Sequence, residues 1–318
     1  MGMKALVFGG AGFLGSYVVG ELARRGHEVT LYDRRRANCL PAGVREIQGD
    51  ILDEAHVVAV TAGMDAVYNF AGAADLDQSV RRPREFVELN VLGNLNVLEG
   101  CRHAGVRRFV YASSAYVLSR KGAFYGTSKR CSERIIEQYH EEYGVEYTIL
   151  RYGSVYGDRA DDSNRIHRML KQALTERRIV FPGDGSEERE YIHAEDAARL
   201  SVDVLAPEFR NQSFILTGVE RFSYRQLLAM IREILGGDVA IEYLDEPYPG
   251  HYTLTPYSFS PGVGRKLVSN PCIDFGQGLI QCLERLHGEL APPPAPVTVP
   301  REPLSVGDAV RVGAPRDA

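Results

Sequence analysis

The first half of the chain alternates short apolar runs with longer amphipathic stretches. The apolar runs predict buried strands at residues 4–8, 28–32, 66–70, 108–112 and 146–150. Between them, apolar residues recur at spacings of three and four, which predicts helices over 13–25, 86–103 and 124–143. Strands that alternate with helices build a parallel sheet covered by helices on both faces. We therefore expect an α/β protein with a doubly wound parallel sheet.

Beyond about residue 160 this rhythm loosens and turn signals become frequent, as in Pro182-Gly183-Asp184-Gly185. We expect a first domain over residues 1–175 and a smaller mixed α/β domain over 176–290, from which part of the chain may return to the first. Residues 291–318 hold seven of the sixteen prolines, including Pro292-Pro293-Pro294. Such a segment does not form a helix, so we expect a proline-rich tail.

Composition narrows the functional class. The chain has 318 residues, of which 44% are hydrophobic, and a net charge of −5, which excludes wholesale disorder and argues against a nucleic-acid partner. We find no signal-peptide pattern and no apolar run long enough for a membrane span. Five cysteines without a CxxC pair suit reduced thiols rather than disulfides or zinc. We therefore expect a cytoplasmic protein that uses no metal.

A glycine-rich turn follows the first strand directly, as Gly9-Gly10-Ala11-Gly12-Phe13-Leu14-Gly15. In this position Gly9 would make the turn, Gly12 would let the backbone approach a pyrophosphate, and Gly15 would pack the helix on the strand. The second strand ends in Asp33, where an acid hydrogen-bonds an adenosine ribose. Together these features predict a Rossmann-type dinucleotide site.

Two details of this site stay open. Asp50, in Gly49-Asp50-Ile51, would either contact the adenine edge or cap the next helix. Asp33 favours NAD because a carboxylate repels the 2′-phosphate of NADP. Arg34 to Arg36, however, are residues of the type that binds phosphate, so NADP remains possible.

Candidate chemistry lies in a serine pair and a Tyr-xxx-Lys spacing. Tyr125 and Lys129 fall on one face of a predicted helix, and Ser114 falls at the carboxyl end of the fifth strand. A tyrosine works as a base near neutral pH only if its pKa is strongly depressed, and a lysine cation with a positive nicotinamide ring nearby would favour the phenolate. With the Ser114 hydroxyl sharing the substrate oxygen, the trio would remove a proton from an alcohol during hydride transfer.

With these motifs the chain resembles the extended short-chain dehydrogenase/reductases, in particular the nucleotide-sugar epimerase/dehydratase family. The resemblance covers residues 3 to about 290, and also rests on Asn69-Phe70-Ala71-Gly72, Asn90-Val91-Leu92-Gly93, Arg151-Tyr152-Gly153-Ser154-Val155-Tyr156-Gly157 and Arg189-Glu190-Tyr191-Ile192-His193. It implies bound NAD(P), a tyrosine base, a C-terminal domain that closes over a sugar, and a homodimer. The implied cofactor-binding residues are Gly9, Gly12, Phe13, Leu14, Gly15, Asp33, Arg34, Asp50, Ile51, Ala71, Gly72, Asn90, Tyr125 and Lys129.

The chain departs from the family pattern around the substrate. Ala115 and Tyr116 replace the acidic pair that dehydratases use, so elimination of water is not expected. Ser154 replaces an asparagine, and Tyr248 and His251 replace an arginine and an aspartate that hold phosphate. Arg189 survives and would grip a phosphate or join a structural salt bridge. The implied substrate contacts are Ser114, Tyr116, Ser154, Arg189, Tyr248 and His251.

Three functions follow. The first is an NAD(P)-dependent epimerase acting on a sugar or sugar nucleotide. The second is a net NADPH-dependent ketoreductase on a non-nucleotide aminosugar or secondary-metabolite intermediate, suggested by the lost phosphate anchors and by Glu187 and Glu188. The third is a dinucleotide-binding sensor without turnover, against which the intact Tyr125 and Lys129 argue. His193 is a candidate for a second catalytic acid, but we expect it to begin the following helix instead.

Overall fold

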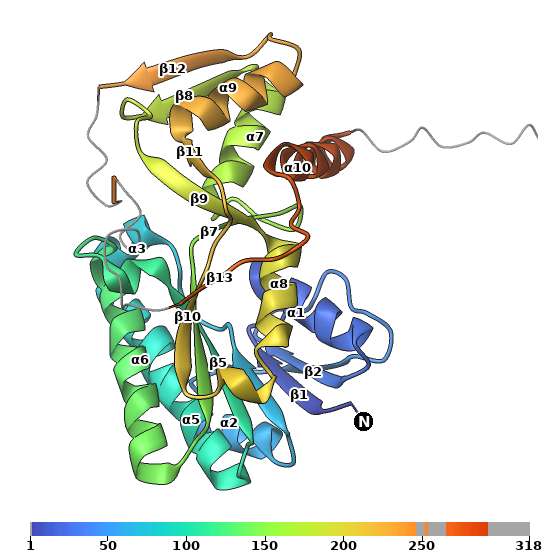
Figure 1. The fold of residues 1–318 in the computed structure, drawn as a ribbon, viewed down its shortest axis with the longest axis vertical. Coiled ribbons are helices and arrows are strands. Elements are labelled where there is room, and N and C mark those ends of the chain that lie inside the picture. The colour runs from blue at the N-terminus through green and yellow to red at the C-terminus, as the bar shows by residue number, and fades with distance from the viewer. Residues whose placement is uncertain (1, 246–251, 254–264, 292–318) are drawn as a thin grey trace, which may run out of the picture.

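The computed structural model describes residues 2–245, 252–253 and 265–291, and its centre is one large parallel sheet (Figure 1). The strand order is β13-β10-β6-β5-β4-β1-β2-β3, and the neighbours pair in parallel. Their bounds are β1 Lys4–Phe8, β2 Glu28–Asp33, β3 Arg45–Gln48, β4 Ala66–Asn69, β5 Arg108–Ser114, β6 Tyr147–Tyr152, β10 Gln212–Leu216 and β13 Arg265–Leu267. The predicted fold class is confirmed.

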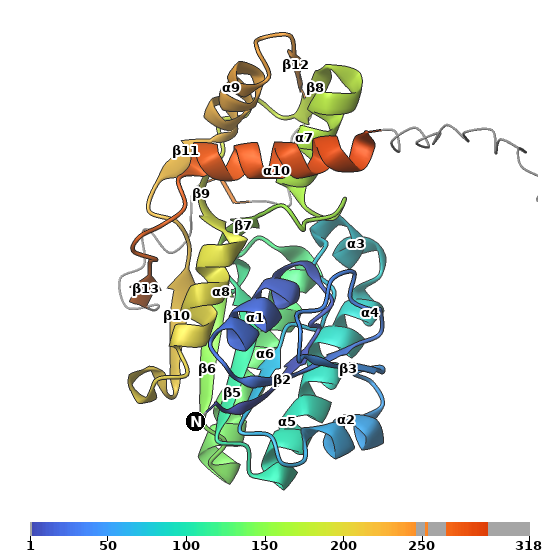
Figure 2. The same ribbon diagram turned by 90° about the vertical axis from the view of Figure 1, so that its right-hand side faces the viewer.

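Alternate residues of β1 enter different hydrophobic cores, one on each face of the sheet. Ala5 and Val7 pack on the side of α1 (Phe13–Arg24) and α8 (Ala194–Asp203). Leu6 and Phe8 pack on the side of the helices α2 Glu54–Thr61, α5 Gly93–Ala104 and α6 Ala123–Tyr143. A parallel strand covered on both faces must be apolar throughout, which explains why the strand predictions from continuous apolar runs succeeded. Figure 1 shows the two layers of helices on opposite sides of the sheet, and Figure 2 looks onto the layer of α1 and α8.

The helix predicted over residues 86–103 is divided. It consists of α4 (Pro83–Val87), a π-helical turn (Glu88–Leu92) and α5, and the short α3 (Leu76–Arg81) precedes it. Apolar periodicity does not reveal the wider π turn, because the flanking helices keep their own faces buried. The π turn places Asn90 against the loop after β4, where its Oδ1 accepts a hydrogen bond from the Ala73 backbone at 2.8 Å.

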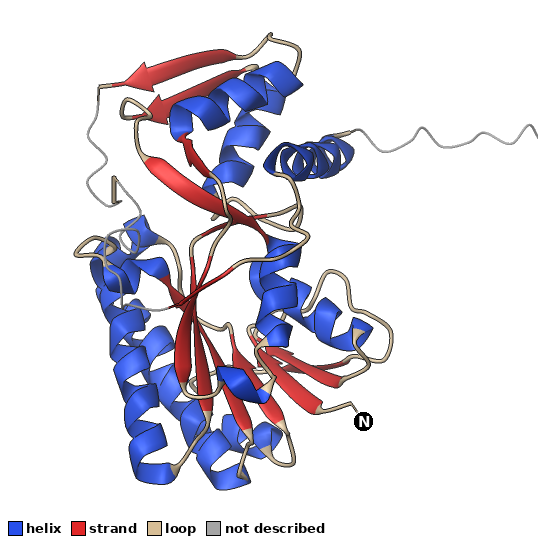
Figure 3. Ribbon diagram, viewed as in Figure 1, coloured by secondary structure: helices blue, strands red, loops and turns tan. Residues whose placement is uncertain are grey.

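A separate group of strands and helices lies beyond the carboxyl ends of the large sheet, and we call this group the second layer (Figure 3). It contains a three-stranded sheet of β7 Ser154–Tyr156, β9 Glu188–His193 and β11 Arg221–Ser223, and a parallel pair of β8 Arg178–Pro182 and β12 Ala240–Leu244. The helices α7 Arg165–Glu176, α9 Tyr224–Ile234 and α10 Phe275–Leu290 share its core. Two 3₁₀ turns, Ala115–Leu118 and Pro207–Phe209, complete the described elements.

The chain returns to the large sheet after this second layer begins. Helix α8 and the strands β10 and β13 all follow residue 175, yet they pack on or extend the large sheet. The domain boundaries at 175 and 290 stay predictions, and the proline-rich tail lies outside the described residues apart from Ala291.

Candidate active site

The glycine loop has the geometry that each of its glycines was expected to provide. Gly9 has a φ of +76°, and a Cβ there would lie 2.4 Å from the Ala71 backbone nitrogen. A Cβ on Gly15 would lie 2.2 Å from the Gly9 carbonyl oxygen, because α1 packs directly on the loop. At Gly12 the nearest atom would be 3.1 Å away. Gly12 is also the N-cap of α1 and supplies no capping side chain, so the first N–H groups of the helix remain available to an anion.

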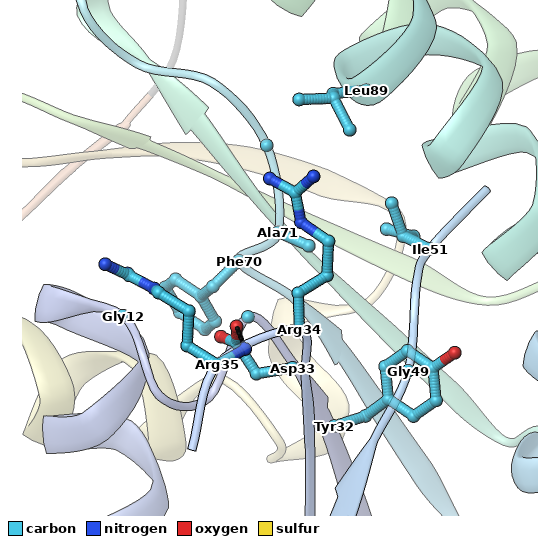
Figure 4. A pocket seen from close by; sticks show the side chains of 12 residues that line it. Gly12, Tyr32, Asp33, Arg34, Arg35, Gly49, Ile51, Phe70, Ala71 and Leu89 are labelled. Carbon is cyan, nitrogen blue, oxygen red and sulfur yellow. Dashed lines mark hydrogen bonds between the residues drawn. The ribbon is translucent and has the colours of Figure 1, made fainter. Parts of the chain in front are cut away.

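A cavity of about 280 Å³ opens beside this loop (Figure 4). It is lined by Gly9, Gly12, Tyr32, Asp33, Arg34, Arg35, Gly49, Ile51, Phe70, Ala71, Gly72 and Leu89. Asp33 accepts hydrogen bonds from the backbone N–H of Ala11 at 3.1 Å and of Arg35 at 2.9 Å, which fixes its carboxylate at the mouth of the loop. Figure 4 shows the Arg34 and Arg35 side chains extending in different directions around Asp33.

Asp50 does not cap α2 in this structure, and its contact with an adenine edge stays a prediction. It is absent from the lining of the cavity, and the cap of α2 is Asp53, whose carboxylate accepts from the His56 N–H at 3.1 Å. Asp50 instead accepts from the Leu52 N–H at 2.9 Å and shapes the turn. The capping alternative is therefore wrong. Tyr32, Phe70 and Leu89 were missed, because apolar strand ends and a helix residue carry no local sign of a cavity.

Ser114, Tyr125 and Lys129 meet in a second cavity of about 410 Å³, which shares Gly9, Gly12, Phe70 and Gly72 with the first. Phe13, Leu14 and Gly15 also line it. Tyr125 and Lys129 extend from α6, and Ser114 ends β5. The Lys129 Nζ donates to the Ala112 carbonyl at 2.8 Å and lies 4.8 Å from the centre of the Tyr111 ring. The structure thus brings together the three residues that the sequence singled out.

Asn90 lies behind this cavity. Its amide donates to the Ala73 carbonyl at 3.0 Å and to the Ser128 hydroxyl at 2.9 Å, so it ties the loop after β4 to α6. A Cβ on Gly72 would lie 2.4 Å from the Asn90 Oδ1, which shows how closely the loop is held. Asn90 therefore supports the cofactor cavity from behind in this structure rather than lining it.

Burial is the largest influence on the pKa values of Tyr125 and Lys129. It raises the pKa of Tyr125, while a hydrogen bond with Ser114 acts to lower it. Burial lowers the pKa of Lys129 to about 8, and the Glu133 carboxylate acts to raise it. Desolvation of the phenolate thus outweighs the hydrogen bond from Ser114, and the depression of the tyrosine pKa by Lys129 together with a nicotinamide ring stays a prediction.

A third cavity, of about 200 Å³, continues from the second, with which it shares Tyr116, Val155, Ser163 and Asn164. Its lining includes Ser154, the three arginines Arg165, Arg168 and Arg189, and the two acids Asp75 and Asp77. Sequence reasoning missed Arg165 and Arg168, since nothing local links the start of α7 to this cavity. Tyr248 and His251 lie outside the described residues.

Arg189 is deeply buried, with 2% of its surface exposed. Its Nη1 donates to the Glu188 carbonyl at 2.7 Å, and its Nη2 has no hydrogen-bond partner among the described residues. The guanidinium lies 4.3 Å from the centre of the Tyr252 ring and 5.5 Å from that of Tyr224. In the part of the chain that the structure describes it forms no ion pair, so the salt-bridge alternative is not supported.

Tyr116 occupies the corner between the second and third cavities. Its ring centre lies 6.2 Å from that of Tyr125 and 4.9 Å from that of Tyr252. Aromatic contacts therefore run from the candidate base to the buried Arg189. Tyr252, which follows the predicted contact His251, was missed by one position.

His193 begins α8, as predicted. Its Nδ1 accepts from the Glu195 N–H at 3.3 Å, and Asp196 lies in the first turn of the helix. Across the described ranges no helix is long and apolar enough to cross a membrane, and no cluster of three or more His, Cys, Asp or Glu side chains could hold a metal.

A Tyr–Lys pair that faces a glycine-loop cavity on a doubly wound sheet is the arrangement of an extended short-chain dehydrogenase/reductase, and this is the class that the fold and site define. A sequence model of the NAD dependent epimerase/dehydratase family matches residues 5–214, and the chain belongs to that family. It is an enzyme that uses NAD. These findings confirm the predicted family and cofactor, and they set aside the sensor without turnover.

Relatives in this family are distant. The chain is 29% identical to a UDP-glucose 4-epimerase of Corynebacterium glutamicum over 76% of this chain and 83% of that protein. It is 27% identical to a dTDP-glucose 4,6-dehydratase of Streptomyces antibioticus over 89% of this chain and 92% of that protein. Among solved structures, the UDP-glucose 4-epimerase of Thermus thermophilus in complex with NAD superposes with a TM-score of 0.76 at 26% identity, covering 90% and 99% of the two chains.

Proposed function

We propose that the protein is an NAD-dependent 4-epimerase of a sugar carried on a nucleotide diphosphate. The observation that carries this proposal is the continuity of the cavities. The second cavity, which holds Ser114, Tyr125 and Lys129, opens into the third cavity, whose lining includes three arginines. A diphosphate suits several guanidinium groups, and a sugar attached to it would reach back toward Tyr125.

The residues divide the chemistry between them. Tyr125 accepts the proton of the reacting hydroxyl, Ser114 hydrogen-bonds the same oxygen, and the Lys129 ammonium stabilises the phenolate. Bound NAD supplies the hydride acceptor and donor, and its positive ring favours the phenolate form of Tyr125. With the hydride returned to the other face of the sugar, Tyr125 would give its proton back to the same oxygen, so the configuration would be reversed without net oxidation. The relatives named as 4-epimerases support C4 as the reacting carbon.

Two observations weigh against the alternatives. Ala115 and Tyr116 follow Ser114, so no carboxyl group stands where elimination of water would need one. Glu187 and Glu188, which favoured a cationic substrate, do not line the described cavities, and Glu188 lies 3.5 Å from Arg221 in an ion pair. The predicted homodimer and cytoplasmic location stay predictions.

A panel of UDP- and dTDP-hexoses tests the reaction class. Each is incubated with the purified enzyme and catalytic NAD and followed by proton NMR. We expect one pair of 4-epimers to interconvert without accumulation of NADH. Stoichiometric NADH, or a 4-keto-6-deoxy product, would contradict epimerisation, and activity only on sugars without a nucleotide would contradict the substrate class.

Arg165→Gln tests the role of the arginine-lined cavity. Arg165 lines that cavity, and its guanidinium lies 4.5 Å from the centre of the Tyr224 ring. Removing one charge from a diphosphate site should raise KM by about 10-fold and change kcat little. Arg232→Gln, on α9 and away from this cavity, is the matched control and should change neither constant. An unchanged KM in Arg165→Gln would remove this arginine from the substrate site.

A further inference from the structure

Glu133 is a buried carboxylate that the reaction described above does not use. It follows Lys129 by one helical turn on α6, as Lys129 follows Tyr125, so the three side chains share one face of the helix. Only 4% of its surface is exposed. A carboxylate in this position costs free energy unless its hydrogen bonds and its charge are satisfied.

Side chains from two strands of the large sheet donate hydrogen bonds to the Glu133 carboxylate. Its Oε1 accepts from the Ser113 hydroxyl at 2.5 Å and from the Arg151 Nε at 3.0 Å, and its Oε2 accepts from the Arg151 Nη2 at 2.8 Å. Ser113 and Arg151 are register partners on β5 and β6. The carboxylate therefore holds α6, which carries Tyr125 and Lys129, against the strand end that carries Ser114.

The charge of Glu133 also acts on Lys129. The Tyr111 ring on β5 lies 4.8 Å from the Lys129 Nζ, Tyr125 and Glu133 stand one turn to either side of Lys129 on α6, and Arg151 on β6 pairs with Glu133. Asp161 lines the same cavity from the loop after β7. Glu133 is the carboxylate that raises the pKa of Lys129, against the burial that lowers it.

We infer that Glu133 is a positioning residue for the Tyr125–Lys129 pair, because its hydrogen bonds to Ser113 and Arg151 fix α6 against β5 and β6 and hold its carboxylate one helical turn from Lys129. The inference rests on the proposed function only for its effect on turnover. Its effect on the charge of Lys129 is also expected in NAD binding alone, since Lys129 lines the second cavity, which shares Gly9, Gly12 and Gly72 with the cavity beside the glycine loop.

The test compares Glu133→Gln with Glu137→Gln, a substitution one turn further along α6 that removes the half-buried partner of the exposed Arg134. NAD affinity is measured by calorimetry from pH 6 to 10, and turnover of the best sugar nucleotide is measured over the same range. In Glu133→Gln the basic limb of both profiles should move to lower pH by about one unit, because a nearby opposite charge stabilises the ammonium by that order. Glu137→Gln should leave both profiles in place.

The affinity profile needs no sugar nucleotide, so it separates failure of this inference from failure of the proposed function. A folded Glu133→Gln whose two profiles keep the wild-type limbs, with activity lowered equally at every pH, would overturn the inference and leave a structural role. If the unpaired Arg151 unfolds that variant, Glu133→Gln/Arg151→Met removes both charges. The double variant should fold and shift the limb in the same direction, and an unshifted limb would again overturn the inference.

Discussion

At the scale of single residues, Tyr125 carries the proton transfer in the proposed reaction. Its hydroxyl bonds to Ser114, and its ring contacts Tyr116, so the phenol is oriented before a substrate arrives. Burial raises the pKa of this hydroxyl, so its ionisation in the proposed reaction requires positive charge close to the phenolate. The orientation is thus a property of the fold, while ionisation depends on occupancy.

Tyr125→Phe tests this assignment. The substitution removes one oxygen and keeps the ring contact, so the fold and the cofactor cavity should persist. We expect kcat to fall by at least about 10²-fold, the order contributed by a general base, with the Kd for NAD within a few-fold of wild type. Turnover by NMR and NAD titration by calorimetry give the two values, and an unchanged kcat would exclude Tyr125 as the base.

Sequence patterns identified those residues whose role follows from local chemistry. Gly9, Gly12, Gly15, Asp33 and the Ser114–Tyr125–Lys129 trio lie together because strand ends of a parallel sheet meet at one edge. The sequence did not reveal Arg165 and Tyr252. Arg165 reaches its cavity from α7 and Tyr252 contacts Arg189, and both placements depend on long-range packing rather than on any local motif.

At the scale of elements, two glycines of the turn from β1 into α1 have different roles: Gly15 allows close packing, and Gly12 leaves room for the cofactor. A Cβ at Gly15 would clash with the loop backbone at 2.2 Å, whereas one at Gly12 would meet its nearest neighbour at 3.1 Å and project where the dinucleotide must approach. The π turn at Glu88–Leu92 is an element that the sequence pattern did not predict. It places Asn90 behind the cavity, yet the regular apolar spacing around it predicted an unbroken helix.

The pair Gly12→Ala and Gly15→Ala should therefore behave differently. Gly15→Ala should lower the free energy of unfolding by about 2–4 kcal/mol, because backbone has to move, and Gly12→Ala by less than about 1 kcal/mol. Gly12→Ala should still weaken NAD binding by about 10-fold or more, since its Cβ intrudes on the cofactor. Chemical denaturation and calorimetry test both effects, and equal losses of stability would contradict the division of roles.

At the scale of the whole molecule, the three cavities form one path across the boundary between the large sheet and the second layer. The cofactor end is built by the strand ends of the sheet, and the arginine-lined end is built by α7, β9 and α9. The periodicity of the first half predicted the sheet. We expected part of the second half to return to the first domain, but the pattern did not identify β10, β13 and α8 as that part, because their segments are short and their partners are distant in sequence.

The central claim is that a hydride leaves C4 of a nucleotide sugar and returns to the same carbon within one turnover. The most direct measurement uses the hexose pair that the panel identifies, labelled with deuterium at C4, and follows the label by NMR and mass spectrometry in ordinary water. The account predicts that the product epimer keeps deuterium at C4, because the hydride that leaves the sugar is the one that returns. Loss of the label to solvent, or its recovery as stoichiometric reduced cofactor, would contradict the account.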